Sequence, residues 1–184
     1  MLPLNKKSNT RQIALFSILG AVTTAIQVLP RPPGLEFTSL LTFSTGVVFG
    51  SVLGASLGAV VMFLNAFFSP WGQAGLNMPF QMLGMGIIGA VGGFYKMEND
   101  VKARFFIETA ILGAFLTFVY YLIVNVGFAI FISLFVSKIP IMESLVLAQV
   151  TGAVFTVSYT ILNIFLFGFG AVPLVNAMRN LLGR

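Results

Sequence analysis

Few side chains in this sequence are able to do chemistry, and they lack the usual partners of a catalytic site. The 184 residues include five carboxylates but no histidine or cysteine, so the commonest general base, the thiol nucleophile and most transition-metal ligands are absent. The carboxylates are Glu36, Glu98, Asp100, Glu108 and Glu143. No Gly-x-x-x-x-Gly-Lys-Ser/Thr phosphate loop occurs either. We therefore expect no catalytic residue, no metal, no cofactor and no ATPase site, and we predict that the protein is not an enzyme.

Amide and hydroxyl side chains form a second pattern, near the same end of successive apolar segments. The members of this polar layer are Gln27, Thr38, Thr42, Asn65, Gln81, Asn125 and Gln149. Two connecting segments, 30–36 and 69–78, lie beside the layer and contribute Glu36, Trp71 and Asn77. One interpretation is a pocket in which amides orient a small ligand while Trp71 or Tyr120 stacks on a flat ring.

The pocket interpretation competes with a structural one. Asn and Gln side chains also hydrogen bond between membrane helices, and a tryptophan often marks the membrane interface. The predicted ligand-binding residues are Glu36, Thr42, Asn65, Trp71, Asn77, Gln81, Tyr120, Asn125 and Gln149. We expect Tyr159 and Asn163 to lie deeper in the membrane, toward the cytoplasm, and we interpret them as packing groups.

The composition indicates how these residues are positioned, because it is typical of a polytopic membrane protein. The chain is 58% hydrophobic and 8% charged, with a mean hydropathy of +0.99. A spanning helix needs roughly 20 apolar residues. Six blocks approach this length, at 12–29, 37–50, 52–68, 79–95, 105–130 and 144–170. We predict an all-α integral membrane protein, with residues 1–184 forming a single compact bundle of six transmembrane helices.

Two segments of this prediction allow alternatives. The basic start followed by an apolar run resembles a signal peptide, but no Ala-x-Ala site closes it and the run is as long as a span. Segment 105–136 is long for one span and short for two, and we interpret it as one span followed by an extracellular connection.

The basic residues predict which way the bundle faces. Six spans place Lys6, Lys7, Arg11, Lys96, Lys102, Arg104, Arg179 and Arg184 on one side. Only Arg31 and Lys138 fall on the other. By the positive-inside rule both termini are cytoplasmic and the polar layer faces outward. The basic excess suits anionic lipid headgroups, so we expect the lipid bilayer and not a nucleic acid as the partner of these charges.

Small residues recur at every fourth position in four of the blocks. The rows are Gly46, Gly50, Gly54 and Gly58, then Gly89 and Gly93, and in the first block Ser17, Ala21 and Ala25. This spacing puts small side chains on one helix face, where another backbone can approach closely. For the glycines we favour packing within the protein over a sliding surface. For Ser17, Ala21 and Ala25, internal packing and contact with a partner remain equally open.

These features together resemble the substrate-binding S components of energy-coupling factor (ECF) vitamin transporters. Three matches carry the resemblance. Residues 21–25, Ala-Val-Thr-Thr-Ala, resemble the family's Ala-x-x-x-Ala row, and residues 36–50 resemble its second helix and glycine-rich turn. Residues 69–72, Ser-Pro-Trp-Gly, and 77–86, Asn-Met-Pro-Phe-Gln-Met-Leu-Gly-Met-Gly, are similar to a subgroup linked to cobalamin.

The resemblance implies a transport subunit in the cytoplasmic membrane of a prokaryote. Such a subunit would capture a vitamin or cofactor precursor outside, rotate in the membrane and release the ligand inside. A transmembrane coupling subunit and two ATPases would supply the energy, and the row of Ser17, Ala21 and Ala25 would dock on the coupling subunit. A corrinoid is a weaker suggestion for the ligand. The alternatives are a membrane interaction or assembly protein, and a small secondary carrier or channel.

Overall fold

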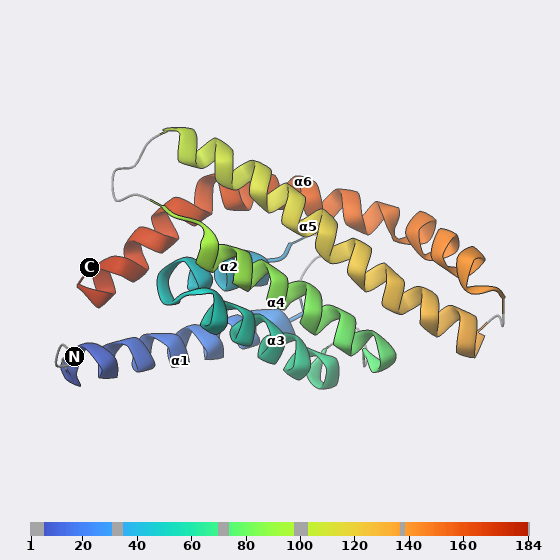
Figure 1. Cartoon of the computed structure of the whole chain (residues 1–184), viewed down its shortest axis with the longest axis horizontal. Coiled ribbons are helices and arrows are strands. Elements are labelled where there is room, and N and C mark those ends of the chain that lie inside the picture. Colours follow the sequence, from blue (N-terminus) through green and yellow to red (C-terminus); the bar gives the residue numbers. More distant parts are fainter. Residues whose placement is uncertain (1–5, 31–34, 70–73, 98–102, 137–138, 184) are drawn as a thin grey trace.

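The structure, a computed structural model, describes residues 6–30, 35–69, 74–97, 103–136 and 139–183, and the regular elements in these ranges are helices (Figure 1). They are α1 (Lys6–Val28), α2 (Thr38–Phe49), α3 (Ser51–Phe68), the 3-10 turn η1 (Gly75–Asn77), α4 (Met78–Phe94), α5 (Ala103–Phe131), the π-helical turn η2 (Ile132–Val136) and α6 (Ile141–Leu182). The predicted all-α fold is confirmed.

Four of these helices are long and apolar enough to cross a membrane. They cover Thr10–Val28, Ser51–Phe68, Arg104–Val136 and Ile141–Leu182. The apolar helix α2 has 12 residues and is therefore about 18 Å long, against roughly 30 Å of hydrocarbon. It lies almost entirely buried among its neighbours. Six membrane crossings accordingly stay a prediction.

The helix bounds differ from the predicted blocks mainly at the two ends of the chain. Helix α1 begins at Lys6 rather than at residue 12, and α6 begins at Ile141 and extends past residue 170 to Leu182. Pro173 removes one backbone hydrogen bond from α6 without ending the helix, which closes at Gly183, a residue with a φ of 71°. Helix α5 begins at Ala103 and continues through η2 to Val136, so segment 105–136 is one helical stretch, and its single crossing of the membrane stays a prediction.

Glycines bring the backbones of α2, α3 and α4 into direct contact. A β-carbon at Gly46 or Gly54 would collide with the carbonyl oxygen of Gly89, and one at Gly93 would collide with the Ser51 backbone. The joint between α2 and α3 is the single residue Gly50, whose φ of 97° disfavours any other residue type. The predicted packing role is confirmed for Gly46, Gly54, Gly58, Gly89 and Gly93, whereas a β-carbon at Gly50 would meet nothing within 4 Å. Helices α2–α4 thus form a closely packed unit.

Helices α5 and α6 pair along much of their length and pack on this unit through aromatic side chains. The Phe43 and Phe167 rings are fully buried, with centroids 5.3 Å apart, and join α2 to α6. The Thr109 hydroxyl of α5 lies 3.0 Å from the Phe167 carbonyl oxygen of α6 and 2.7 Å from the Phe105 carbonyl oxygen of its own helix, so its one proton is shared between the two. The Phe167 ring also lies against Gly113, where a β-carbon would collide with it.

Both ends of the chain lie at one end of the molecule, on the left of Figure 1. There Arg179 donates to the Met97 carbonyl oxygen at 2.9 Å, and Tyr95 donates to Glu108 at 3.0 Å. Glu108 also pairs with Arg104 at 3.2 Å. Away from this end α1 and α3 terminate and α2 and α4 begin, while α5 and α6 extend beyond them toward the right of Figure 1. The residues at these four helix ends, with the facing parts of α5 and α6, form the candidate site.

Candidate functional site

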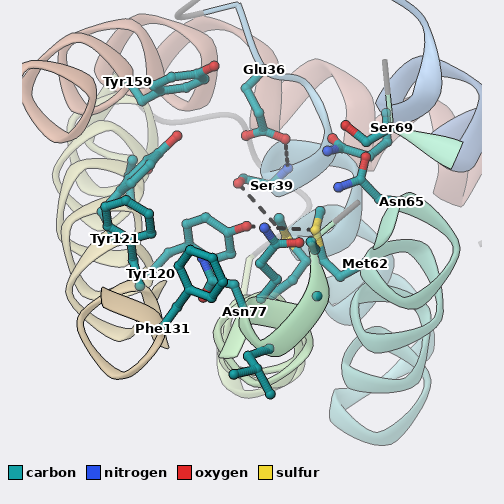
Figure 2. Close-up of a pocket in the computed structure, with 18 of the residues that line it drawn as sticks. Glu36, Ser39, Met62, Asn65, Ser69, Asn77, Tyr120, Tyr121, Phe131 and Tyr159 are labelled. Carbon is teal, nitrogen blue, oxygen red and sulfur yellow. Dashed lines mark hydrogen bonds between the residues drawn. The ribbon is translucent and has the colours of Figure 1, made fainter. Parts of the chain in front are cut away.

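A cavity of about 430 Å³ lies between the ends of α1–α4 that are away from the two chain ends and the facing parts of α5 and α6, and Figure 2 shows the side chains around it. All six α-helices, or the residues next to their ends, contribute to its wall. The lining residues are Gln27, Glu36, Ser39, Met62, Asn65, Ser69, Ala74, Gly75, Leu76, Asn77, Gln81, Met85, Thr117, Tyr120, Tyr121, Phe128, Phe131, Tyr159 and Asn163. A polar wall on α1–α4 thus faces an aromatic wall on α5 and α6.

Glu36 is held at the start of α2. The Ser39 backbone N–H donates to Glu36 Oε1 at 2.8 Å, so the carboxylate satisfies one of the free N–H groups of the first helical turn. The positive end of the helix dipole favours a negative charge here. Glu36 is 8% exposed, and nearby Thr38 donates to Gln27 Oε1 at 2.7 Å, which connects α1 to α2 beside the cavity.

Three tyrosines form the aromatic wall. The Tyr121 ring lies 5.3 Å from that of Tyr120 and 5.2 Å from that of Tyr159, measured between centroids. Figure 2 shows Tyr121 and Tyr159 on the side opposite Met62 and Asn65, while Tyr120 reaches across and its hydroxyl donates to Met62 Sδ at 3.7 Å. Rings in such an array present flat faces and edges on which a planar ligand can pack. Phe131 extends the aromatic wall along α5.

Asn163 provides a polar group whose orientation is determined by its neighbour. Its Nδ2 donates to Thr117 Oγ1 at 2.8 Å, and the Thr117 hydroxyl donates to the Gly113 carbonyl oxygen at 2.7 Å. Because a hydroxyl has one proton, Thr117 Oγ1 can only accept from the amide. Asn163 Oδ1 is left without a hydrogen-bond partner among the described residues, and the side chain is 1% exposed.

Two further amide oxygens near the start of α4 lack partners among the described residues. Gln81 Oε1 is buried in the cavity wall without a donor. Asn77 Oδ1 is likewise unpaired, and it lies against the backbone of Gly127 on α5, where a β-carbon would collide with it. A buried acceptor without a donor costs about 1–3 kcal/mol, and a ligand that supplies a donor recovers this free energy.

The structure brings together five of the nine residues predicted to bind a ligand. Glu36, Asn65, Asn77, Gln81 and Tyr120 all line the cavity. Their contact with a ligand stays a prediction. Trp71 lies outside the described residues.

The three remaining predicted ligand residues lie elsewhere. Asn125 Nδ2 donates to Gln149 Oε1 at 2.9 Å, so these two amides link α5 to α6, and neither lines the cavity. Thr42 is fully buried and packs where Gly58 of α3 approaches α2. The structure therefore supports interhelical hydrogen bonding for Asn125 and Gln149, whereas the Thr42 hydroxyl has no hydrogen-bond partner among the described residues.

Several lining residues are absent from the predicted set. Tyr159 and Asn163, interpreted above as packing groups, are both in the cavity wall, four residues apart and hence on one face of α6. Thr117 and Tyr121 have the same spacing on α5. This spacing of polar and aromatic residues on the last two helices is the signal that would have identified the aromatic wall.

A second, apolar groove of about 680 Å³ runs between α1 and α3. Ser17, Ala21 and Ala25 line it and are exposed, whereas Leu19 and Thr23 of α1 are buried against the bundle. Internal packing therefore does not account for the row of small residues.

Comparison with protein families gives a match over nearly the whole chain. The model of the family described as "ECF-type riboflavin transporter, S component" matches residues 7–180. Comparisons with curated proteins and with solved structures found no match. The family match confirms the resemblance carried by the motifs, and it does not support a corrinoid as the ligand. The chain belongs to the family of ECF-type riboflavin transporter S components, which are membrane transport subunits and not enzymes.

Proposed function

We propose that this protein captures riboflavin, or a close chemical relative of it, in the cavity between α1–α4 and α5–α6. The observation that carries the proposal is the pairing of an aromatic wall with unpaired acceptors in one cavity. Tyr120, Tyr121 and Tyr159 offer surfaces for a planar ring system, while Gln81 and Asn163 offer acceptors for N–H or O–H groups. A flavin has both a flat ring with an imide N–H and a hydroxylated side chain.

The size of the cavity supports the same class of ligand. Small-molecule sites are usually about 300–1,000 Å³, and this one is about 430 Å³. A vitamin with a fused ring and a short side chain matches this volume. A corrinoid, with its macrocycle and appended nucleotide, is too large for it.

In the proposed transport cycle the cavity faces outward and the chain ends face the cytoplasm of a prokaryotic cell. The eight basic residues predicted to be cytoplasmic support this orientation. Because the sequence has no nucleotide site, a transmembrane coupling subunit and two ATPases would drive release inward. The exposed row of Ser17, Ala21 and Ala25 beside the apolar groove is the proposed docking surface.

Titration of the purified protein with riboflavin tests the proposal, with binding measured by the change in flavin fluorescence. Gln81→Ala removes an acceptor from the cavity wall and should weaken binding about tenfold to a hundredfold. Asn180→Ala, which removes an exposed amide near the end of α6, is the matched control and should bind as the unchanged protein does. Absence of riboflavin binding by the folded protein would refute the proposed ligand.

A further inference from the structure

The described part of the cavity wall has a negative group but no positive one. Glu36 is the single carboxylate among the described lining residues, and these include no lysine or arginine. At 8% exposure its carboxylate is largely withdrawn from bulk water, so dissolved salt screens it poorly. Its Oε1 atom accepts the Ser39 N–H, and a carboxylate can accept several bonds in total. The wall thus has a negative charge with no positive charge in the described wall to balance it.

The unpaired hydrogen-bonding groups of the wall are also acceptors, which favours a ligand with donors. An amide side chain can usually rotate by about 180°, which exchanges the positions of its N–H donor and its oxygen acceptor. Asn163 cannot do so without losing its bond, because Thr117 Oγ1 has already donated its proton to Gly113 and requires a donor from the amide. Asn163 therefore presents an acceptor from α6, and Glu36 presents another from the start of α2.

Such a wall discriminates between a vitamin and its phosphate ester. A phosphate monoester has about 1.5–2 negative charges at pH 7 and offers strong acceptors in place of a hydroxyl donor. It would meet like charge at Glu36 and an acceptor at Asn163, without an arginine or lysine among the described wall residues to pair with. An uncharged, donor-rich ligand meets neither penalty.

We propose that the cavity selects its ligand by charge, with Glu36 excluding phosphorylated forms and admitting the uncharged vitamin. This inference rests on the proposed function, which it makes specific to the unphosphorylated ligand. Two unit charges about 10 Å apart at an effective dielectric constant of about 20 repel enough to change affinity by roughly tenfold. A phosphate bound in the part of the cavity next to Glu36 lies within this range of its carboxylate.

The test compares the dissociation constants of riboflavin and riboflavin 5′-phosphate for the purified chain. We expect the phosphate ester to bind at least about tenfold more weakly. Glu36→Gln keeps an acceptor for the Ser39 N–H but removes the charge. It should therefore lower the ratio of the two dissociation constants, ester over riboflavin, about tenfold, mainly through tighter binding of the ester. Glu143→Gln makes the same change of net charge at an exposed residue of α6 outside the cavity wall, and it should leave the ratio unchanged.

The outcomes separate the two proposals. If riboflavin binds and its phosphate ester binds equally or more tightly, the charge filter is wrong while the proposed function stands. If Glu36→Gln weakens both flavins by the same factor, Glu36 is a general binding group and the filter is also wrong. If neither flavin binds, the proposed ligand fails. The filter is then tested by thermal stabilisation with thiamine, pyridoxine and their phosphate esters, and greater stabilisation by an ester than by its parent vitamin overturns it.

Discussion

At Thr117 one hydroxyl proton determines what a neighbouring amide presents to the cavity. The proton is used in the bond to the Gly113 carbonyl oxygen, so the Asn163 nitrogen must face Thr117. The Asn163 oxygen then stays unpaired among the described residues. A residue that need not touch the ligand can in this way determine the ligand's hydrogen-bonding pattern.

Thr117→Val should weaken riboflavin binding about tenfold, because it leaves the Asn163 nitrogen without its acceptor and frees the amide to turn. Thr117→Ser keeps the hydroxyl and should bind riboflavin nearly as the unchanged protein does. The measurement is the same fluorescence titration, with a thermal unfolding curve for each variant to show that both are folded. Equal affinity in the Val and Ser variants would show that the amide orientation has no effect on binding.

Residue types alone predicted part of the cavity wall, and helix geometry explains the remainder. Glu36 and Gln81 could be found because each is a polar residue at the start of an apolar segment. Asn125 could not be excluded by type or depth. At about 100° per residue it lies about 80° around α5 from Thr117, whereas Tyr121 lies about 40° away. The larger rotation directs Asn125 toward Gln149 on α6.

At the scale of helices, the two kinds of small-residue row have different surroundings. The glycines of α2–α4 contact backbone of the same chain, which the four-residue spacing predicts correctly. The row on α1 has the same spacing but lines an exposed groove. Sequence spacing identifies a face that admits close approach, whereas only the assembled bundle shows which faces are already occupied.

Replacing Ala21 and Ala25 together with Trp should abolish ATP-driven riboflavin uptake and assembly with the coupling subunit, because bulky side chains fill the groove between α1 and α3. Riboflavin affinity of the isolated chain should stay unchanged, since neither residue lines the cavity. Ile13→Trp is the matched control, at an exposed α1 position outside the groove and about 80° to 120° around the helix from Ala21 and Ala25.

The measurement is uptake into liposomes with and without the coupling subunit and ATPases. Normal uptake by the double Trp variant would show that the docking surface lies elsewhere. Accumulation of riboflavin by the isolated chain, driven by an ion gradient, would instead identify a secondary carrier.

At the scale of the molecule, the ends of α1–α4 that border the cavity lie away from the two chain ends (Figure 1). The basic residues that decide orientation cluster in the sequence at 6–11, 96–104 and 179–184. Composition could therefore predict the helical bundle, whereas its orientation in the membrane stays a prediction. The buried, 12-residue α2 could not be assigned as a membrane crossing or an internal helix from hydropathy, because packing against protein and contact with lipid demand the same apolar residues.

The predicted orientation can be tested with single cysteines, since the chain has no native ones. Cysteines at Gln73 and Ser137 should react with an impermeant thiol reagent in intact cells, while one at Asn99 should not. These three positions lie outside the described residues, in segments predicted from the sequence to connect helices. Reaction of Asn99→Cys from outside, at the level of a cell-surface control, would invert the orientation and place the cavity at the cytoplasmic face.

The unequal helix lengths couple this protein to bilayer thickness. The uncharged stretch of α6 between Glu143 and Arg179 is about 50 Å long at 1.5 Å per residue, whereas the hydrocarbon layer is about 30 Å deep. Hydrophobic mismatch of this size is relieved by tilting, bending or locally thickening the membrane. A change in lipid acyl-chain length would therefore shift the preferred tilt of the subunit in the membrane. The lipid would in this way influence how readily the cavity opens to each side of the membrane.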